Sequence, residues 1–315
     1  MGRMVYLVPL SDAGRGRLDI VKDHLERSGM KWEELSCDDI RFRLTEPNKN
    51  IYVCDPMEGD AYDKLINIGC TVSGCGAIVS SLALKTNFPR KRRTKEVGGL
   101  FSLALHTCEI CVTNVPKENR ESLMMKAMRM GAKVSPNMST SVTHLIVGEV
   151  NSKKYIVASE NKIMTVTPKW VDDLWNRSGK LFYSQIYEHQ LTHILYLVKQ
   201  LEPMNAMSQN FLDITRKCHC PIFYGCGFSV SNISSDKRTD LANLIITHGG
   251  CYMGQMDKNK CTHLIVGSAG GKKYQYAKKW GITIVPHKWI KDSIERGFAL
   301  STELPEYQVN GSEER

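Results

Sequence analysis

Short apolar runs and amphipathic stretches alternate through the middle and the end of the chain. The run Glu109–Thr113 is rich in β-forming residues, and the stretch after Pro116 keeps helical spacing up to Gly131, a natural helix stop. Strands that alternate with helices indicate an α/β fold, in which helices cover both faces of a parallel sheet. The pattern predicts these elements in order: strand 109–113, helix 116–130, strand 133–134, strand 144–147, helix 153–161, strand 164–166 and helix 168–178.

The chain contains an internal duplication. Residues 143–175 align with residues 262–294 at a constant offset of 119, and both begin with the letters THLIVG. Upstream of a single-residue shift, Val112–Val115 and Arg120 align with Val230–Ile233 and Arg238. A repeat of roughly 85–90 residues is large enough to form its own hydrophobic core. A fainter copy precedes them, with a strand at Ile51–Cys54, a helix around Tyr62–Leu65 and a strand near Thr71.

Three repeats are therefore expected. We refer to residues 1–92 as the first, degenerate repeat, to residues 100–183 as the second repeat and to residues 216–302 as the third repeat. Residues 303–315 are expected to form a tail. Residues 184–215 are expected to be a linker or insertion; Leu191, Ile194, Leu195, Val198 and Leu201 give this segment either a short helix or little order.

Composition and charge narrow the classes of partner. The chain has 315 residues, 42% of them hydrophobic and 24% charged, which excludes wholesale disorder, and its uncharged runs are too short to predict a membrane segment. The net charge of +9 is uneven: it is −1 over residues 1–90, +7 over residues 91–182 and +3 over residues 183–315. The last two parts are therefore expected to meet anionic partners. The basic run from Arg90 to Lys95 is either a nuclear localisation signal or a solvated linker.

Cysteine and histidine usage favours neither a disulfide framework nor a metal site. The eleven cysteines are odd in number and lie mostly within apolar runs, as expected in a reducing compartment. The pairs Cys108-x-x-Cys111 and Cys218-His219-Cys220 have zinc-like spacing, but the repeats do not share it, so we expect no metal and no cofactor.

No catalytic constellation is repeated. His144 and His263 each follow a threonine in a strand, without an acid or nucleophile at a useful spacing, so both are expected to be structural. Trp170 and Trp289 are expected in the core. The stretch Gly267–Lys273 is one residue short of a phosphate-binding loop and lacks its Ser or Thr, so we expect neither enzymatic activity nor a small-molecule substrate.

The sharpest functional signal is a pair of lysines at the start of the second helix in both full repeats. Cations at a helix N-terminus oppose the macrodipole at a cost of about 0.3–1 kcal/mol, so a pair kept twice indicates an anion site. A hydroxyl at the end of the first strand and an arginine seven residues later complete a set that can hold a phosphate. The alternative interpretation is that these residues are solvated surface charges that bind no ligand. The two predicted sets are Thr113, Arg120 and Lys154, and Ser231, Arg238 and Lys273.

Together these features resemble the BRCT domain family. The order of elements, the glycine after the first helix, the T-H-L-I-V strand, the K-K-Y helix start and the tryptophan of the last helix all match. The chain is also similar to a triple-BRCT region of a replication and checkpoint scaffold, except over residues 184–215. The stretches that carry this similarity are IYVCDP, SVTHLIVGEVNSKKYIVA, CPIFYGC and HGGCYMGQMDKNKCTHLIV. The resemblance implies three tandem domains, each a four-stranded parallel sheet flanked by helices.

The resemblance also implies a function. It predicts a nuclear, non-enzymatic module of DNA replication initiation, DNA repair and the DNA-damage checkpoint that reads phosphorylated Ser and Thr motifs. The implied partners are the phosphorylated tail of the checkpoint sliding clamp and a phosphorylated origin-firing factor. Asn114 and Asn232 stand where the family often has glycine. The first repeat lacks the hydroxyl–arginine–lysine set, so it is expected to pack against the second without reading phosphate. The alternative is direct DNA binding through the basic second repeat.

Overall fold

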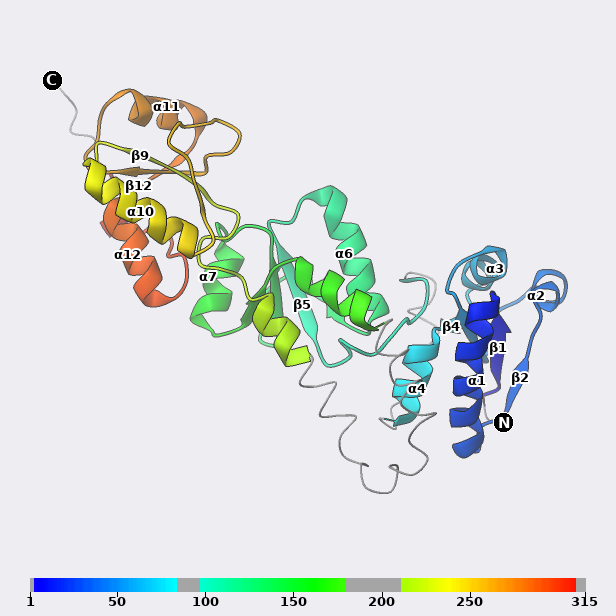
Figure 1. Cartoon of the computed structure of the whole chain (residues 1–315). Coiled ribbons are helices and arrows are strands. Elements are labelled where there is room, and N and C mark those ends of the chain that lie inside the picture. Colours follow the sequence, from blue (N-terminus) through cyan, green and yellow to red (C-terminus); the bar gives the residue numbers. More distant parts are fainter. Residues whose placement is uncertain (1–2, 84–96, 179–210, 310–315) are drawn as a thin grey trace, which may run out of the picture. The chain divides into compact units, whose positions relative to one another are not determined.

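A computed structural model describes residues 3–83, 97–178 and 211–309 of the chain (Figure 1). It contains three four-stranded parallel sheets with the strand orders β2-β1-β3-β4, β6-β5-β7-β8 and β10-β9-β11-β12. In each sheet the first strand in sequence lies between the second and the third, and helices flank the strands. The α/β class predicted from the alternation of strands and helices is confirmed.

The first sheet belongs to the degenerate repeat. Its elements are β1 (Val5–Pro9), α1 (Asp12–Arg27), β2 (Trp32–Glu34), α2 (Cys37–Arg43), β3 (Ile51–Asp55), α3 (Asp60–Ile68), β4 (Thr71–Ser73) and α4 (Cys75–Ala83). One cluster of buried side chains packs α1 and α4 on one face, and a second packs α2 and α3 on the other. The predicted strand at Ile51, the helix around Tyr62 and the strand near Thr71 are confirmed.

The second repeat follows the predicted order closely. Its elements are β5 (Glu109–Thr113), α6 (Lys117–Arg129), β6 (Lys133–Val134), β7 (His144–Val147), α7 (Lys153–Glu160), β8 (Met164–Val166) and a last helix over residues 169–178. Gly131 follows α6 with φ of +92°, which explains why the helix stops there. Trp170 in the last helix is fully buried, and its indole N–H donates to Thr215 Oγ1 over 2.9 Å.

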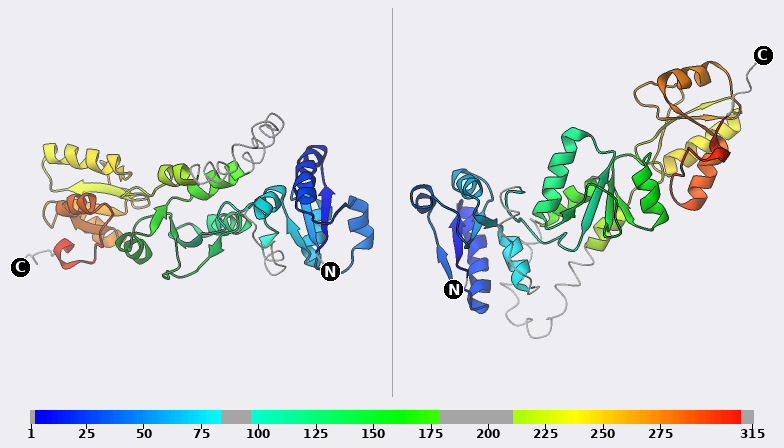
Figure 2. Two further views of the ribbon diagram at one scale, coloured as in Figure 1. Left: turned by 90° about the horizontal axis from the view of Figure 1, so that it is seen from below. Right: turned by 180° about the vertical axis from the view of Figure 1, so that it is seen from behind.

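The third repeat has the same arrangement. Its elements are β9 (Gly227–Ser231), α10 (Ser235–Thr247), β10 (Cys251–Tyr252), β11 (His263–Val266), α11 (Lys272–Trp280), β12 (Thr283–Pro286) and α12 (His287–Arg296). Alternate residues of β11 face opposite sides, so Ile265 packs with α10 and α12 while Leu264 and Val266 pack with α11. Figure 2 shows these helices on the two faces of the sheet.

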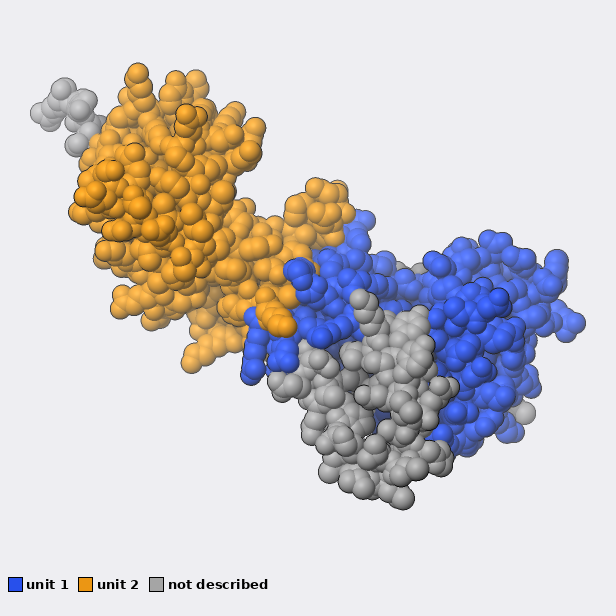
Figure 3. All heavy atoms as spheres, viewed as in Figure 1, with its two compact units in different colours: residues 1–109, 121–134, 169–216 blue, residues 110–120, 135–168, 217–315 orange. Residues whose placement is uncertain are grey.

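The chain divides into two compact units (Figure 3). One comprises residues 1–109, 121–134 and 169–216, and the other comprises residues 110–120, 135–168 and 217–315. Within the first unit, Arg129 Nη2 of the second repeat lies 3.8 Å from Met57 Sδ of the first, and Gly74 N of the first repeat donates to Leu100 O of the second over 2.7 Å. The first repeat therefore contacts the second, as the sequence predicts.

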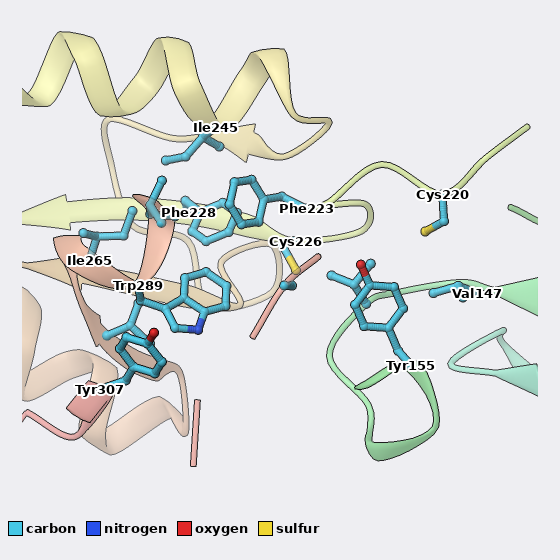
Figure 4. Close-up of a cluster of buried hydrophobic side chains, with 14 of the residues drawn as sticks. Val147, Tyr155, Cys220, Phe223, Cys226, Phe228, Ile245, Ile265, Trp289 and Tyr307 are labelled. Carbon is cyan, nitrogen blue, oxygen red and sulfur yellow. The ribbon is translucent and has the colours of Figure 1, made fainter. Parts of the chain in front are cut away.

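The second unit has a continuous core drawn from both full repeats. Tyr155 and Val147 of the second repeat belong to the same buried cluster as Phe223, Phe228 and Trp289 of the third (Figure 4). The predicted core positions of both tryptophans are thus confirmed. This cluster buries large aromatic side chains, which dominate the energetics of a core.

The same unit covers the edge of the second sheet. β8 is the end strand of its sheet, and residues 218–220 run beside it: Val166 and His219 form an antiparallel bridge. Thr167 N donates to Cys218 O over 2.9 Å, and Cys220 N donates to Thr165 O over 3.0 Å. The open hydrogen-bonding groups of β8 are therefore paired by the segment that leads into the third repeat.

Some predicted features lie outside the described residues, namely the basic run from Arg90 to Lys95 and the helical spacing from Leu191 to Leu201. The proposed limits of the repeats, the linker and the tail stay predictions. All eleven cysteines are free thiols. Within residues 3–83, 97–178 and 211–309, no helix combines the length and the apolar character that crossing a bilayer requires.

Candidate functional site

The candidate hydroxyl groups lie at the carboxyl ends of the central strands. Thr113 ends β5 and pairs in register with Val147, the last residue of β7; Ser231 ends β9 and pairs with Val266 of β11. Both are largely buried, with 6% and 9% of their surface exposed. The carboxyl ends of parallel strands are where open α/β sheets bind their ligands.

The two candidate lysines make the same set of contacts in both repeats. Lys154 Nζ donates to Pro136 O over 2.6 Å and lies 3.5 Å from both Val112 O and Cys111 Sγ. In the third repeat, Lys273 Nζ donates to the equivalent Gly254 O, Val230 O and Ser229 Oγ over 2.8, 3.1 and 3.1 Å.

These contacts place each lysine on the sheet face that carries its hydroxyl. Residues two apart in a strand point to the same face, so Cys111 and Ser229 mark the face of Thr113 and Ser231. The ammonium of Lys273 has three close acceptors, whereas that of Lys154 has one close and two distant ones. The second repeat therefore leaves its ammonium more donor capacity for an anion.

The candidate arginines lie at the first turn of the helix that follows each hydroxyl. Arg120 Nη2 donates to Val115 O over 2.9 Å, and Arg238 Nη2 donates to Ile233 O over 3.2 Å, so each folds back toward its strand end. Burial lowers the pKa of Lys273, and the positive charge of Arg238 lowers it further. That repulsion acts between two cations of one predicted set, and an anion bound between them would relieve it.

Two asparagines that the sequence marked only as departures from the family help to build the site. Asn114 and Asn232 adopt the left-handed backbone region, with φ of +50° and +55°. Asn114 Nδ2 donates to Glu149 O and Asn151 O over 3.2 and 3.0 Å. Asn232 Nδ2 makes the same pair of bonds, to Ser268 O and Gly270 O over 3.2 and 3.0 Å. Each asparagine thus holds the loop that leads into the lysine-bearing helix.

The glycine that ends the T-H-L-I-V-G motif has a steric role. A Cβ at Gly148 would lie 2.0 Å from Asn114 O, and one at Gly267 would lie 2.1 Å from Asn232 O. Gly148 N also donates to Thr113 O over 3.0 Å. The glycine lets the strand end approach the hydroxyl-bearing strand closely.

The two sites differ at the residue before the lysine pair. Ser152 caps α7: its Oγ accepts from Tyr155 N over 3.1 Å and from Thr113 Oγ1 over 3.0 Å. The equivalent Gly271 has φ of +86° and supplies no side-chain cap to α11. The serine was not predicted as part of the site, although its place before a helix is typical of an N-cap.

The first repeat has a different arrangement at the same place. Pro9 ends β1 and pairs with Asp55, and Ala61 is the second residue of α3, where the other repeats have a hydroxyl and a lysine. Asp55 forms a largely buried ion pair with Arg17. A carboxylate therefore lies at the carboxyl ends of these strands, and it is an arginine of this repeat that pairs with it. That the first repeat does not read phosphate stays a prediction.

The two strand histidines are structural, as predicted. His263 is 1% exposed and stacks on Trp289 with ring centroids 5.3 Å apart. Burial lowers the pKa of His263, and likewise that of His144, to about 4, so both rings are neutral at neutral pH. Among the residues that the structure describes, no three His, Cys, Asp or Glu side chains gather as a metal site would require.

Comparisons with known proteins agree with the fold. A model of the twin BRCT domain matches residues 108–170 and 227–289. The chain is 28% identical over 200 residues to the S-M checkpoint control protein rad4 of Schizosaccharomyces pombe, and this match covers 63% of the chain and 26% of that protein. It is 20% identical over 249 residues to the human protein ECT2, covering 78% of the chain and 24% of that protein. The chain thus spans about a quarter of these relatives.

One similar solved structure is that of Rad4 BRCT1,2 in complex with a Crb2 phosphopeptide. It is 26% identical to this chain, with a TM-score of 0.48, and the match covers 66% of this chain and 100% of that one.

Proposed function

The chain belongs to the BRCT family over residues 108–170 and 227–289, and on that premise we propose that it is a scaffold module that binds phosphorylated serine and threonine motifs. Its phosphate-binding residues are Thr113, Arg120 and Lys154 in the second repeat and Ser231, Arg238 and Lys273 in the third. BRCT domains are binding modules, and we assign this chain no catalytic role.

The observation that carries the proposal is the equivalent position of the two lysines in their repeats. Each ammonium lies over the carboxyl end of the central strand, on the face of a buried hydroxyl, and next to a helix N-terminus. A helix N-terminus offers unpaired amides to an anion, and a phosphorylated side chain carries about −1.5 to −2 charges. Two such sites in one chain can bind a doubly phosphorylated partner with avidity when its linker spans them.

The partners follow from the family and its checkpoint relatives. We propose that they are phosphorylated replication and checkpoint proteins in the nucleus, including the sliding-clamp tail and the origin-firing factor bound by the topoisomerase-II-binding scaffold that this sequence resembles. Direct DNA binding by the basic second repeat is the competing function. It predicts affinity that falls steeply with salt and does not need a phosphopeptide.

The test compares Lys154→Glu with Lys153→Glu in the full chain, using matched phosphorylated and unphosphorylated peptides and duplex DNA. Lys153 is the exposed neighbour in the same helix turn, so its reversal controls for net charge. A charge-assisted hydrogen bond contributes about 1.5–3 kcal/mol, so loss of the Lys154 contact should weaken binding at that site by roughly 10- to 150-fold. Lys154 also donates to a backbone carbonyl, so the melting temperatures of both variants are compared to check that its replacement does not destabilise the fold. Equal phosphopeptide affinities for the two variants would refute the assignment of Lys154 to a phosphate site.

A further inference from the structure

The lysine-bearing helices of the two full repeats begin alike and then diverge on their exposed side. α7 and α11 both start with Lys-Lys-Tyr. Where α7 has Val157, Ser159 and Glu160, α11 has Tyr276, Lys278 and Lys279, at the repeat offset of 119. Since the two helices occupy the same place in duplicated domains, the difference concerns what each helix presents to its surroundings.

An aromatic pair lies on the outside of α11. Tyr276 is 49% exposed, and its ring lies 5.3 Å from that of Trp280, centroid to centroid, with the planes 37° apart. Trp280 also packs against the buried cluster beneath α11, which fixes the pair in place. Figure 1 shows α11 on the opposite side of its sheet from α10 and α12. A fixed, exposed aromatic surface is typical of an interaction site.

α11 is also strongly basic. Its nine residues include four lysines and no acid, and Lys272 and Lys279 lie on the face of the aromatic pair, because they are four residues before and three residues after Tyr276. Within the described part of the chain, no acidic side chain forms an ion pair with Lys272, Lys278 or Lys279. Lys278 lies over the Tyr274 ring at 4.9 Å instead. The charge complement of this surface is an acidic segment.

We propose that the exposed side of α11, formed by Lys272, Tyr276, Lys279 and Trp280 and here called the α11 surface, binds residues that flank the phosphorylated residue in a partner. The flanking segment is acidic and carries an aromatic or aliphatic side chain that packs on Tyr276. This inference rests on the proposed function, because it extends the third-repeat phosphate site. Lys273 of that site is the second residue of the same helix, so the two are continuous.

Size and shape favour a peptide over a single-stranded nucleic acid. A nine-residue helix is roughly 13 Å long, which matches about four residues of an extended peptide. Bases need separate flat rings on which to stack, whereas Tyr276 and Trp280 pack against each other. The basic groups also follow one helix and continue into a phosphate site.

The test isolates the third repeat within the full chain by starting from Lys154→Glu. One phosphoserine peptide is flanked by Asp, Glu and Phe, a second by Gly and Ser, and each has an unphosphorylated twin. The triple variant Tyr276→Val, Lys278→Ser, Lys279→Glu gives α11 the exposed residues of α7. We expect the acidic, aromatic peptide to bind about tenfold more tightly than the Gly–Ser peptide, and the triple variant to lose this preference while still requiring phosphate. The reciprocal variant Val157→Tyr, Ser159→Lys, Glu160→Lys, in a chain with Lys273→Glu, should gain the preference.

Each of the other outcomes overturns the α11 surface, the third-repeat phosphate site or the proposed function. A preference that survives in the triple variant overturns the α11 surface and leaves the proposed function intact. Phosphate-dependent binding by the parent chain but none with Lys154→Glu overturns the third-repeat site, and the inference with it. Binding without phosphate dependence in every chain overturns the proposed function itself. If the triple variant loses affinity for a single-stranded oligodeoxynucleotide and keeps its peptide preference, the surface binds nucleic acid.

Discussion

The asparagine after each hydroxyl offers a sharp test of how the phosphate site is held. Asn114 makes two side-chain hydrogen bonds to the loop before α7, from a left-handed backbone conformation. Glycine adopts this conformation without strain, so Asn114→Gly removes the two bonds and keeps the backbone. Two hydrogen bonds at about 0.5–1.5 kcal/mol each should lower the local opening free energy by about 1–3 kcal/mol.

Hydrogen exchange of the full chain measures this effect directly. We expect the amides of residues 149–155 to exchange roughly 5- to 150-fold faster in Asn114→Gly, with phosphopeptide affinity at the second-repeat site falling too. Asn232→Gly is the matched control, because it should accelerate the loop before α11 and leave the loop before α7 unchanged. Unaltered exchange at residues 149–155 in Asn114→Gly would show that the side chain of Asn114 does not hold this loop.

Two further predictions follow from other contacts. Gly148→Ala should lower the melting temperature and the phosphopeptide affinity together, because its Cβ would lie 2.0 Å from Asn114 O; an unchanged thermal transition of the full chain would contradict this. NMR titration of the His263 ring should give a pKa of about 4 against 6.5 for an ordinary histidine. Since the folded pKa is depressed, the stability that this ring contributes is complete above about pH 6.5 and is lost as the pH falls toward 4. A midpoint near 6.5 would show that the ring is not buried.

The sequence predicted the elements of the full repeats well because each is encoded locally and twice. Helix α6 runs over Lys117–Arg129 against a predicted span from Pro116 to Met130, and the strand at His144 matches its predicted bounds. The elements of the first repeat are harder to predict from the sequence. Its helix α1 has buried Leu18, Val21 and Leu25, but Gly14 and Gly16 lower its helical propensity and weaken the signal.

The candidate site was only partly visible in the sequence. The hydroxyl, the arginine and the lysine stood out because both repeats keep them at the same spacing. The bonds of Asn114 reach backbone carbonyls 35 and 37 residues away, and spacing alone does not reveal such contacts. The carbonyl acceptors of Lys154 and Lys273 depend likewise on the sheet bringing distant strand ends together.

The pairing of residues 218–220 with β8 has a practical consequence for dividing this chain. A cut between the second and third repeats would strip the cover from β8 and bare the aromatic side chains that the two repeats share. Uncovered strand edges recruit other chains, so each half made alone should be prone to self-association. These two repeats are therefore best produced as one piece.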